Sequence, residues 1–248
     1  MQHILRLLTL LTAGMLVSCL DGREEIWLNA NGSGRAEIAY TVPAAAARLQ
    51  GGEAGIRQLI GEFLKNTPAI STSRHEVVTD RDRLKIRVEA TFESAMELQE
   101  ISQGKSLERL PSSAQYLAGH MALAFSGRTV DFSRTVTLGK ALPGAIFLPA
   151  SQFEGRVLTY IIHLPAAASE TNATRVTNGG RTLEWNYPLA SAIRGPLKLH
   201  FKTQIPIPSW AIASLIAVVT LLAYAVVRRQ IRARKSSPAR SPASSTTD

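Results

Sequence analysis

Ser102 and Lys105 have the spacing of a catalytic pair. The S-x-x-K pattern over residues 102–105 sets a hydroxyl nucleophile and an amine base one helical turn apart. The companion motifs SDN and KTG are missing, and G-x-S-x-G does not occur. Gly104 would weaken a helix that had to hold the pair. We therefore expect no catalytic residues and do not expect an enzyme.

The spacing of the histidines does not predict a metal site. None belongs to an H-x-x-x-H or H-E-x-x-H pattern, which would place two ligands on one helical face. Phosphate loops and dinucleotide fingerprints are also absent, so no metal or other cofactor is expected. Histidines within predicted strands are expected to be hydrogen-bonded wall residues. The five are His3, His75, His120, His163 and His200.

Cys19 is the only cysteine in 248 residues, which excludes an internal disulfide. It follows a weakly basic start, with His3 and Arg6, and an uncharged apolar run over 7–17. That run is too short to span a bilayer but has the length of a signal-peptide apolar region. The N-terminus therefore indicates export.

Leu16, Val17, Ser18 and Cys19 resemble the lipobox of bacterial lipoproteins. The resemblance implies that the Cys19 thiol becomes a diacylglyceryl thioether carrying chains such as palmitate. It also implies that the signal peptide, residues 1–18, is removed. The alternative is an ordinary leader or a buried helix, in which Cys19 is a small apolar filler.

Residues 210–227 form an uncharged stretch of 18 residues, about 27 Å long as a helix. Trp210 and Tyr224 suit the two membrane interfaces, and Arg228 and Arg229 begin a basic cluster that the positive-inside rule places in the cytoplasm. We expect a transmembrane helix over 205–227 and a basic, disordered cytoplasmic tail over 228–248. The alternative is a buried core helix, which would normally have a polar face.

The net charge of +9 does not indicate nucleic-acid binding, because it is concentrated at the termini. Seven of the 28 basic residues lie in the leader and the C-terminal segment, and the middle of the chain carries only about +3. The expected partners are membrane lipids and other envelope components, with no nucleic acid.

The remaining residues, 19–204, are predicted to form an extracytoplasmic domain rich in β-strands. The clearest strand places Leu84, Ile86 and Val88 on one face and charged residues on the other. Glycines at 32 and 34 suit a tight turn between the first two strands. Strand signals occur within 24–42, 75–94, 120–138, 156–164, 181–189 and 196–204.

Two helices are predicted between these strands. An apolar stripe recurs at helical spacing from Ile56 to Leu64 and ends before Pro68. Ser94 begins a capping box for a second helix that ends near Gln103. The expected fold class is α+β, with an antiparallel β-rich extracytoplasmic domain, two inserted helices and one C-terminal transmembrane helix.

The stretch 163–203 resembles the LppM-like bacterial envelope lipoproteins, in which a strand bearing a tryptophan, a loop and a last strand precede one membrane helix. The matching landmark is Trp185 after the Asn178-Gly179-Gly180 turn. The resemblance implies a non-catalytic envelope protein, with lipid handling as one role to consider. The segment 53–113 has no counterpart in this pattern, which leaves a shared ligand site open.

One loop, residues 141–151, places Ile146, Phe147 and Leu148 between prolines and outside any alternating strand. Exposed, these side chains could contact lipid, and buried they would fill the core. We expect a membrane-anchored, non-catalytic envelope lipoprotein that acts as a surface-tethered binding or interaction module. The alternative is a lipid-binding or lipid-transfer protein with an apolar cavity.

Overall fold

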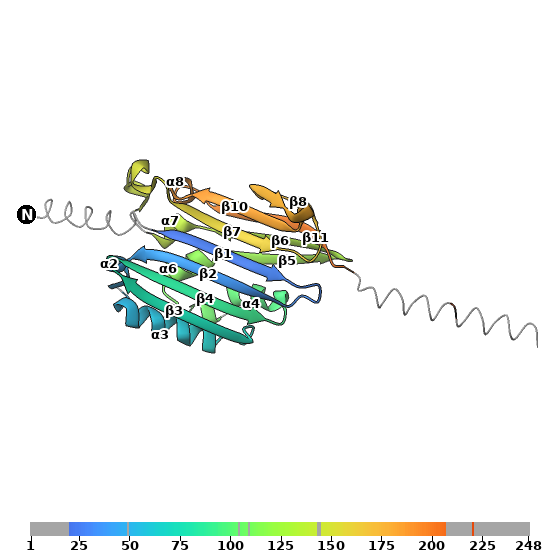
Figure 1. Cartoon of the computed structure of the whole chain (residues 1–248), viewed down its shortest axis with the longest axis horizontal. Helices are drawn as coiled ribbons and strands as arrows, with labels where there is room; N and C mark the ends of the chain where they lie inside the picture. Colours follow the sequence, from blue (N-terminus) through green and yellow to red (C-terminus); the bar gives the residue numbers. More distant parts are fainter. Residues whose placement is uncertain are drawn as a thin grey trace, which may run out of the picture. The chain divides into compact units, whose positions relative to one another are not determined.

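Two β-sheets dominate the computed structural model, which describes residues 20–48, 50–103, 105–108, 110–142, 145–206 and Thr220 (Figure 1). The larger sheet has the order β3-β4-β2-β1-β7-β10-β9 and the smaller one β5-β6-β11-β8. The chain divides into two compact units, Met1–Pro206 and Ile207–Asp248. All elements described below belong to the first unit.

The larger sheet contains seven strands of three to ten residues. They are β1 (Asp21–Leu28), β2 (Gly34–Pro43), β3 (Thr72–Asp80), β4 (Arg83–Phe92), β7 (Val157–His163), β9 (Arg175–Thr177) and β10 (Thr182–Pro188). The smaller sheet contains β5 (His120–Ser126), β6 (Thr129–Val136), β8 (Ala168–Thr171) and β11 (Leu197–Gln204).

The hairpins predicted over 24–42 and 75–94 are confirmed as β1–β2 and β3–β4, and the strands predicted within 120–138 also form an antiparallel pair, β5–β6. The turn before β2 contains Gly32 at φ 86°, a conformation that glycine adopts without a steric penalty. This local turn chemistry favours the β1–β2 pair.

The prediction of an antiparallel domain is wrong at one place, because β1 and β7 are parallel. They pair in the register Glu24↔Tyr160 and Ile26↔Ile162. β2 occupies one edge of β1 through the hairpin, so β7 adds to the other edge, after the chain between them has supplied β3 and β4 of the larger sheet and β5 and β6 of the smaller one. No turn residue encodes such a pairing.

The two predicted helices are confirmed as α3 (Gly52–Lys65) and α4 (Ala95–Gln103). The expectation of only two helices was wrong, because several further short helices are present. The short strands β8 and β9 were not predicted from the sequence either. These elements are too short for a periodic signal. The further helices are α2 (Ala44–Arg48), α5 (Lys105–Glu108), α6 (Ser112–Ala118), α7 (Leu138–Ala141), α8 (Leu189–Ala192), η1 (Ala145–Phe147), η2 (Ala150–Phe153) and η3 (Asn178–Gly180).

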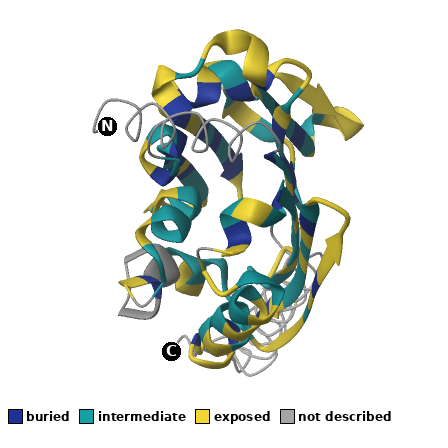
Figure 2. Ribbon diagram, turned by 90° about the vertical axis from the view of Figure 1, so that its left-hand side faces the viewer, coloured by how far each residue is buried: buried dark blue, intermediate teal, exposed yellow. Residues whose placement is uncertain are grey.

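The core has two parts. Ile56 and Ile60 of α3 pack against a small cluster that contains Val77 and Leu84 of the outer strands. The main cluster joins the two sheets through the strands β6, β7, β10 and β11. Figure 2 shows the buried residues, in dark blue, recurring along the inner strands, while the connecting loops are largely exposed.

Most of the two proposed membrane anchors lies outside the described part of the chain; of the helix predicted over 205–227, only Ile205, Pro206 and Thr220 are described, and Ile205 and Pro206 are not helical. The lipobox residues Leu16–Cys19 and the interface residues Trp210, Tyr224, Arg228 and Arg229 lie outside the described part. Of the helices in the described ranges, none combines the length and apolar character needed to cross a bilayer. Signal peptide, transmembrane helix and cytoplasmic tail therefore stay predictions.

Candidate functional site

An apolar cavity of about 300 Å³ lies between the inner faces of the two sheets. Its walls are largely aliphatic and aromatic. They come from β1 (Ile26, Leu28), β7 (Tyr160, Ile162), β5 (Met121, Leu123, Phe125), β6 (Val130, Phe132, Arg134), β11 (Leu199, Phe201, Thr203) and α4 (Ala95, Met96, Leu98, Gln99).

Strand register explains why these side chains face one another. On β1 and β7, Ile26 is paired with Ile162, so both side chains leave the larger sheet on the same face. In the smaller sheet, Phe132 is paired with both Leu123 and Phe201, which places one residue from each of three strands on the opposite wall. The cavity is thus formed by the period-two alternation of both sheets.

Helix α4 covers one side of the cavity and is held at its start and at its middle. The hydroxyl oxygen of Ser94 accepts a hydrogen bond from the Met96 amide at 3.2 Å, as the predicted N-cap requires. The Ala95 amide donates to the Gly32 carbonyl at 2.8 Å, which ties the helix start to the β1–β2 turn. Gln99 accepts from the Leu123 amide at 3.2 Å, so the helix also satisfies a group of edge strand β5.

A buried ion pair forms the inner end of the cavity. Arg134 of β6 donates two hydrogen bonds to Glu24 of β1, at 2.5 and 3.2 Å, with side-chain exposures of 8% and 9%. The Tyr40 hydroxyl donates to the same carboxylate at 2.5 Å. Tyr40 can lie across β1 because its neighbour is Gly22, where a Cβ would collide with the tyrosine ring.

The electrostatics of this end follow from burial and from Glu24. Burial alone would lower the pKa of Arg134, but the charge and hydrogen bonds of Glu24 outweigh it and raise this pKa. Burial and the Glu24 charge raise the pKa values of Tyr40 and Tyr160. Arg134 is therefore cationic and both phenols are neutral across the physiological pH range.

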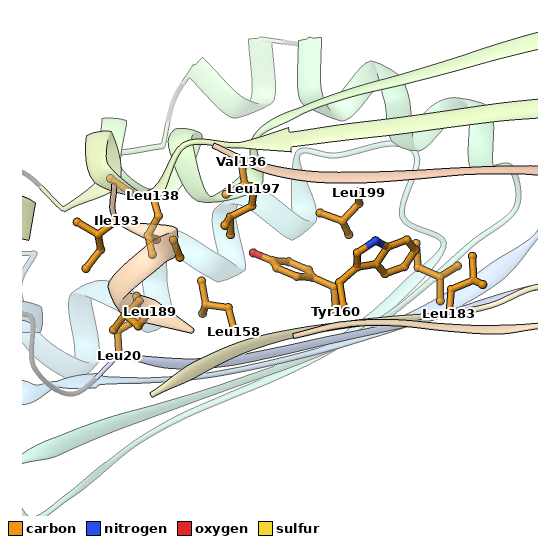
Figure 3. Close-up of a cluster of buried hydrophobic side chains, with 14 of the residues drawn as sticks. Leu20, Val136, Leu138, Leu158, Tyr160, Leu183, Leu189, Ile193, Leu197 and Leu199 are labelled. Carbon is orange, nitrogen blue, oxygen red and sulfur yellow. The ribbon is translucent and has the colours of Figure 1, made fainter. Parts of the chain in front are cut away.

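The space beyond the ion pair is filled. Figure 3 shows Leu158, Leu189 and Leu197 packed together at the end of the sheets where β1 begins, with the Tyr160 hydroxyl pointing toward Leu158 and Leu197. This hydroxyl is buried and has no hydrogen-bond partner within the described ranges. The interior between the sheets is thus close-packed at the end where β1 begins, and it contains the cavity at the other end.

Three apolar side chains of the cavity wall are also exposed to solvent. Met96 of α4 is 59% exposed, Phe125 of β5 is 47% exposed and Ile205 after β11 is 39% exposed. We call these residues the rim. Arg128 fixes the rim at Ile205, because its backbone carbonyl accepts from the Ile205 amide at 2.8 Å and its guanidinium donates to the Ile205 carbonyl at 2.9 Å.

The predicted lipid-contact residues do not line this cavity. Phe147 is 79% exposed and Ile146 is exposed, whereas Leu148 is half-buried and packs on the main cluster. They lie on and after η1, whose first residue, Ala145, is fully buried and holds the segment in place. Their contact with lipid stays a prediction.

Of the other candidate residues, the two strand histidines His163 and His200 are each paired with a carboxylate. His163 Nε2 lies 2.7 Å from Glu25, and His200 Nε2 lies 3.0 Å from Asp131, so both are partnered as expected for strand histidines. In the described ranges, no group of three or more metal-ligating side chains is present. Ser102 lies in α4 and Lys105 in α5, and their side chains fall outside what the structure describes.

The sequence reading missed the ion pair, although a signal for it exists. In β6 the inward positions are Phe132, Arg134 and Val136, so one charged residue interrupts an apolar alternation. Such a residue must be paired when it is buried, which predicts a buried acid on a facing strand. The pattern alone could not identify that acid as Glu24.

No family model and no curated protein matches the chain. Among solved structures, the chain is similar to the folded domain of the Mycobacterium tuberculosis LppM protein, determined by NMR, with a TM-score of 0.48 and 13% sequence identity. The similarity covers 77% of this chain and 92% of that domain.

Proposed function

We propose that the protein is a membrane-anchored envelope lipoprotein that binds one acyl chain of a lipid in the cavity between its sheets. The carrying observation is the cavity itself, a largely apolar space of about 300 Å³ whose paired charges, Glu24 and Arg134, lie at its inner end. Such a volume lies at the lower end of the range for ligand sites. The alternative function from the sequence is therefore favoured over a generic interaction module.

A cavity of this size needs an explanation on energetic grounds. Protein interiors are close-packed, and an unfilled apolar space loses the dispersion contacts of the atoms around it. Water gains little there, because apolar walls offer few hydrogen-bond partners. A hydrocarbon chain would replace the missing contacts without needing polar groups.

The ion pair at the inner end supports entry of the tail rather than the headgroup. Arg134 and Glu24 neutralise each other, and Arg134 also donates to the carbonyls of Leu117 and Ala118. A charged headgroup at this depth would compete with bonds that are already made and would itself be desolvated. The tail therefore points inward and the headgroup stays near solvent.

The anchoring part of the proposal rests on the sequence. A lipidated Cys19 and a membrane helix over 205–227 would hold the domain against the outer face of the cell membrane, with residues 228–248 in the cytoplasm. Cells fed a palmitate analogue should yield labelled wild-type protein and unlabelled Cys19→Ser. Wild-type protein that stays unlabelled, or that an alkaline carbonate wash removes from membranes, would contradict the anchoring.

Lipid binding is tested on the full chain purified in detergent. We expect native mass spectrometry to show protein with one bound lipid. Leu123→Trp adds an indole to the cavity wall and should remove most of that lipid, while Val78→Trp, which places the same indole on the outer edge strand β3, should leave it bound. Equal lipid in both variants, or none in the wild type, would overturn acyl-chain binding. Binding of an envelope protein would then be the remaining interpretation.

A further inference from the structure

We propose that the rim of the cavity, Met96, Phe125 and Ile205, is a membrane-docking surface, through which an acyl chain passes directly between the bilayer and the cavity. This inference rests on the proposed lipid-binding function and adds the source of the ligand and its route. It commits to the bilayer as the occupant of the rim.

The apolar composition of the rim is typical of a surface that is buried against a partner when the protein functions. Three large apolar side chains from three separate elements, α4, β5 and the segment after β11, are exposed together around one cavity. Scattered apolar residues are normal on protein surfaces, but a group that also lines a hydrophobic cavity marks an interaction site. Inserted in a bilayer, these side chains would leave water and open the cavity to the acyl region.

The rim contains Ile205, which lies only a few positions before the predicted membrane stretch. Ile205 belongs to the rim and Pro206 also lines the cavity, and the predicted membrane stretch begins at Trp210. The five residue steps from Ile205 to Trp210 span at most about 18 Å when extended. If the predicted membrane helix begins at Trp210, Ile205 would therefore lie within that distance of the point where the helix enters the bilayer.

The segment after β11 is held to the domain by hydrogen bonds. Arg128, in the β5–β6 turn, holds Ile205 through its backbone and its guanidinium. Phe125 is in the same hairpin, three positions earlier. The segment after β11 is thus held to the hairpin that carries Phe125, which favours contact between this part of the rim and the bilayer.

The test measures whether the rim is in lipid in the intact protein. Single cysteines at Phe125 and Met96 are labelled with an environment-sensitive fluorophore in full-length protein in vesicles that contain lipids with a nitroxide on the headgroup or acyl chain. The control is Val78→Cys, because Val78 is exposed but lies one position from the inward-facing, fully buried Val77. It therefore lies on the opposite face of the larger sheet. Unsubstituted protein measures any label taken up by Cys19.

We expect blue-shifted emission and loss of most of the fluorescence at positions 125 and 96, and little quenching at position 78. Probes at 125 and 96 that behave like the probe at 78 would overturn the docking surface. Bound lipid is measured by mass spectrometry in the same preparations. Lipid found with unquenched rim probes rejects the docking surface alone, whereas quenched probes without bound lipid reject the acyl-chain function.

Discussion

The Arg134 guanidinium binds the Glu24 carboxylate through two hydrogen bonds that join the smaller sheet to the larger one. Arg134→Met should destabilise the domain by about 3–5 kcal/mol, because it leaves a buried carboxylate without its cation. Glu24→Leu combined with Arg134→Met should recover much of this loss. Urea unfolding followed by tryptophan fluorescence measures both. A double variant less stable than Arg134→Met would contradict this account.

Asn172 links Trp185 of β10 to β11. Its side-chain oxygen accepts from the Trp185 indole and from the His200 amide, each at 2.8 Å. Asn172→Ala should cost about 1–3 kcal/mol, because it leaves these donors unsatisfied. The loss should shrink in a Trp185→Phe background, and a double-mutant cycle by urea unfolding measures the coupling. Additive effects would show that the indole bond contributes nothing.

Glu25 should make the domain less stable in acid. Burial alone would raise the pKa of Glu25, but hydrogen bonds and charge from His163 and Arg23 outweigh it, so the folded-state pKa lies below its usual 4.5. The stabilisation is therefore complete above about pH 4.5 and is lost as the pH falls through the folded-state pKa.

Glu25→Gln should accordingly reduce the slope of unfolding free energy against pH in this acidic range. Glu154→Gln removes an exposed loop carboxylate and is the matched control. Urea denaturation at several pH values gives both slopes. Identical slopes for wild type and Glu25→Gln would exclude this carboxylate as a source of acid sensitivity.

Phe147 tests the lipid contact predicted for the loop. Because its side chain is largely exposed, Phe147→Asp should leave the unfolding midpoint unchanged. It should lower affinity for liposomes if the side chain enters the interface. A pull-down compares it with Tyr116→Asp, a change at another exposed aromatic residue. Equal binding by wild type and Phe147→Asp would exclude a lipid contact here.

Most of the secondary structure was predictable, because its signals are local. The alternation of Leu84, Ile86 and Val88 acts within the β3–β4 hairpin, and the glycine turn before β2 acts within the β1–β2 hairpin. Helix α4 begins where Ser94 caps it, as the sequence indicates. In each case the determining atoms lie within a few positions of one another.

The cavity was not predictable, because it depends on which distant strands face one another. Ile26 and Phe201 are ordinary inward residues of two strands, and nothing in either strand specifies the other sheet. The same holds for Glu24 and Arg134, which meet across 110 positions. The position of Arg134 in an apolar strand indicates a buried acidic partner, but only the fold identifies that partner as Glu24.

The parallel pairing of β1 with β7 also governs when the domain can fold. The first strand of the domain lies in the middle of its sheet, and its neighbour on one edge, Val157–His163, is made late. Contacts between such distant segments form slowly, since a long loop must close before they are gained. In a chain that crossed a membrane from its N-terminus, β1 could pair with β2 early, but its other edge would stay unpaired until residues 157–163 had been translocated, so the larger sheet could not be completed before then.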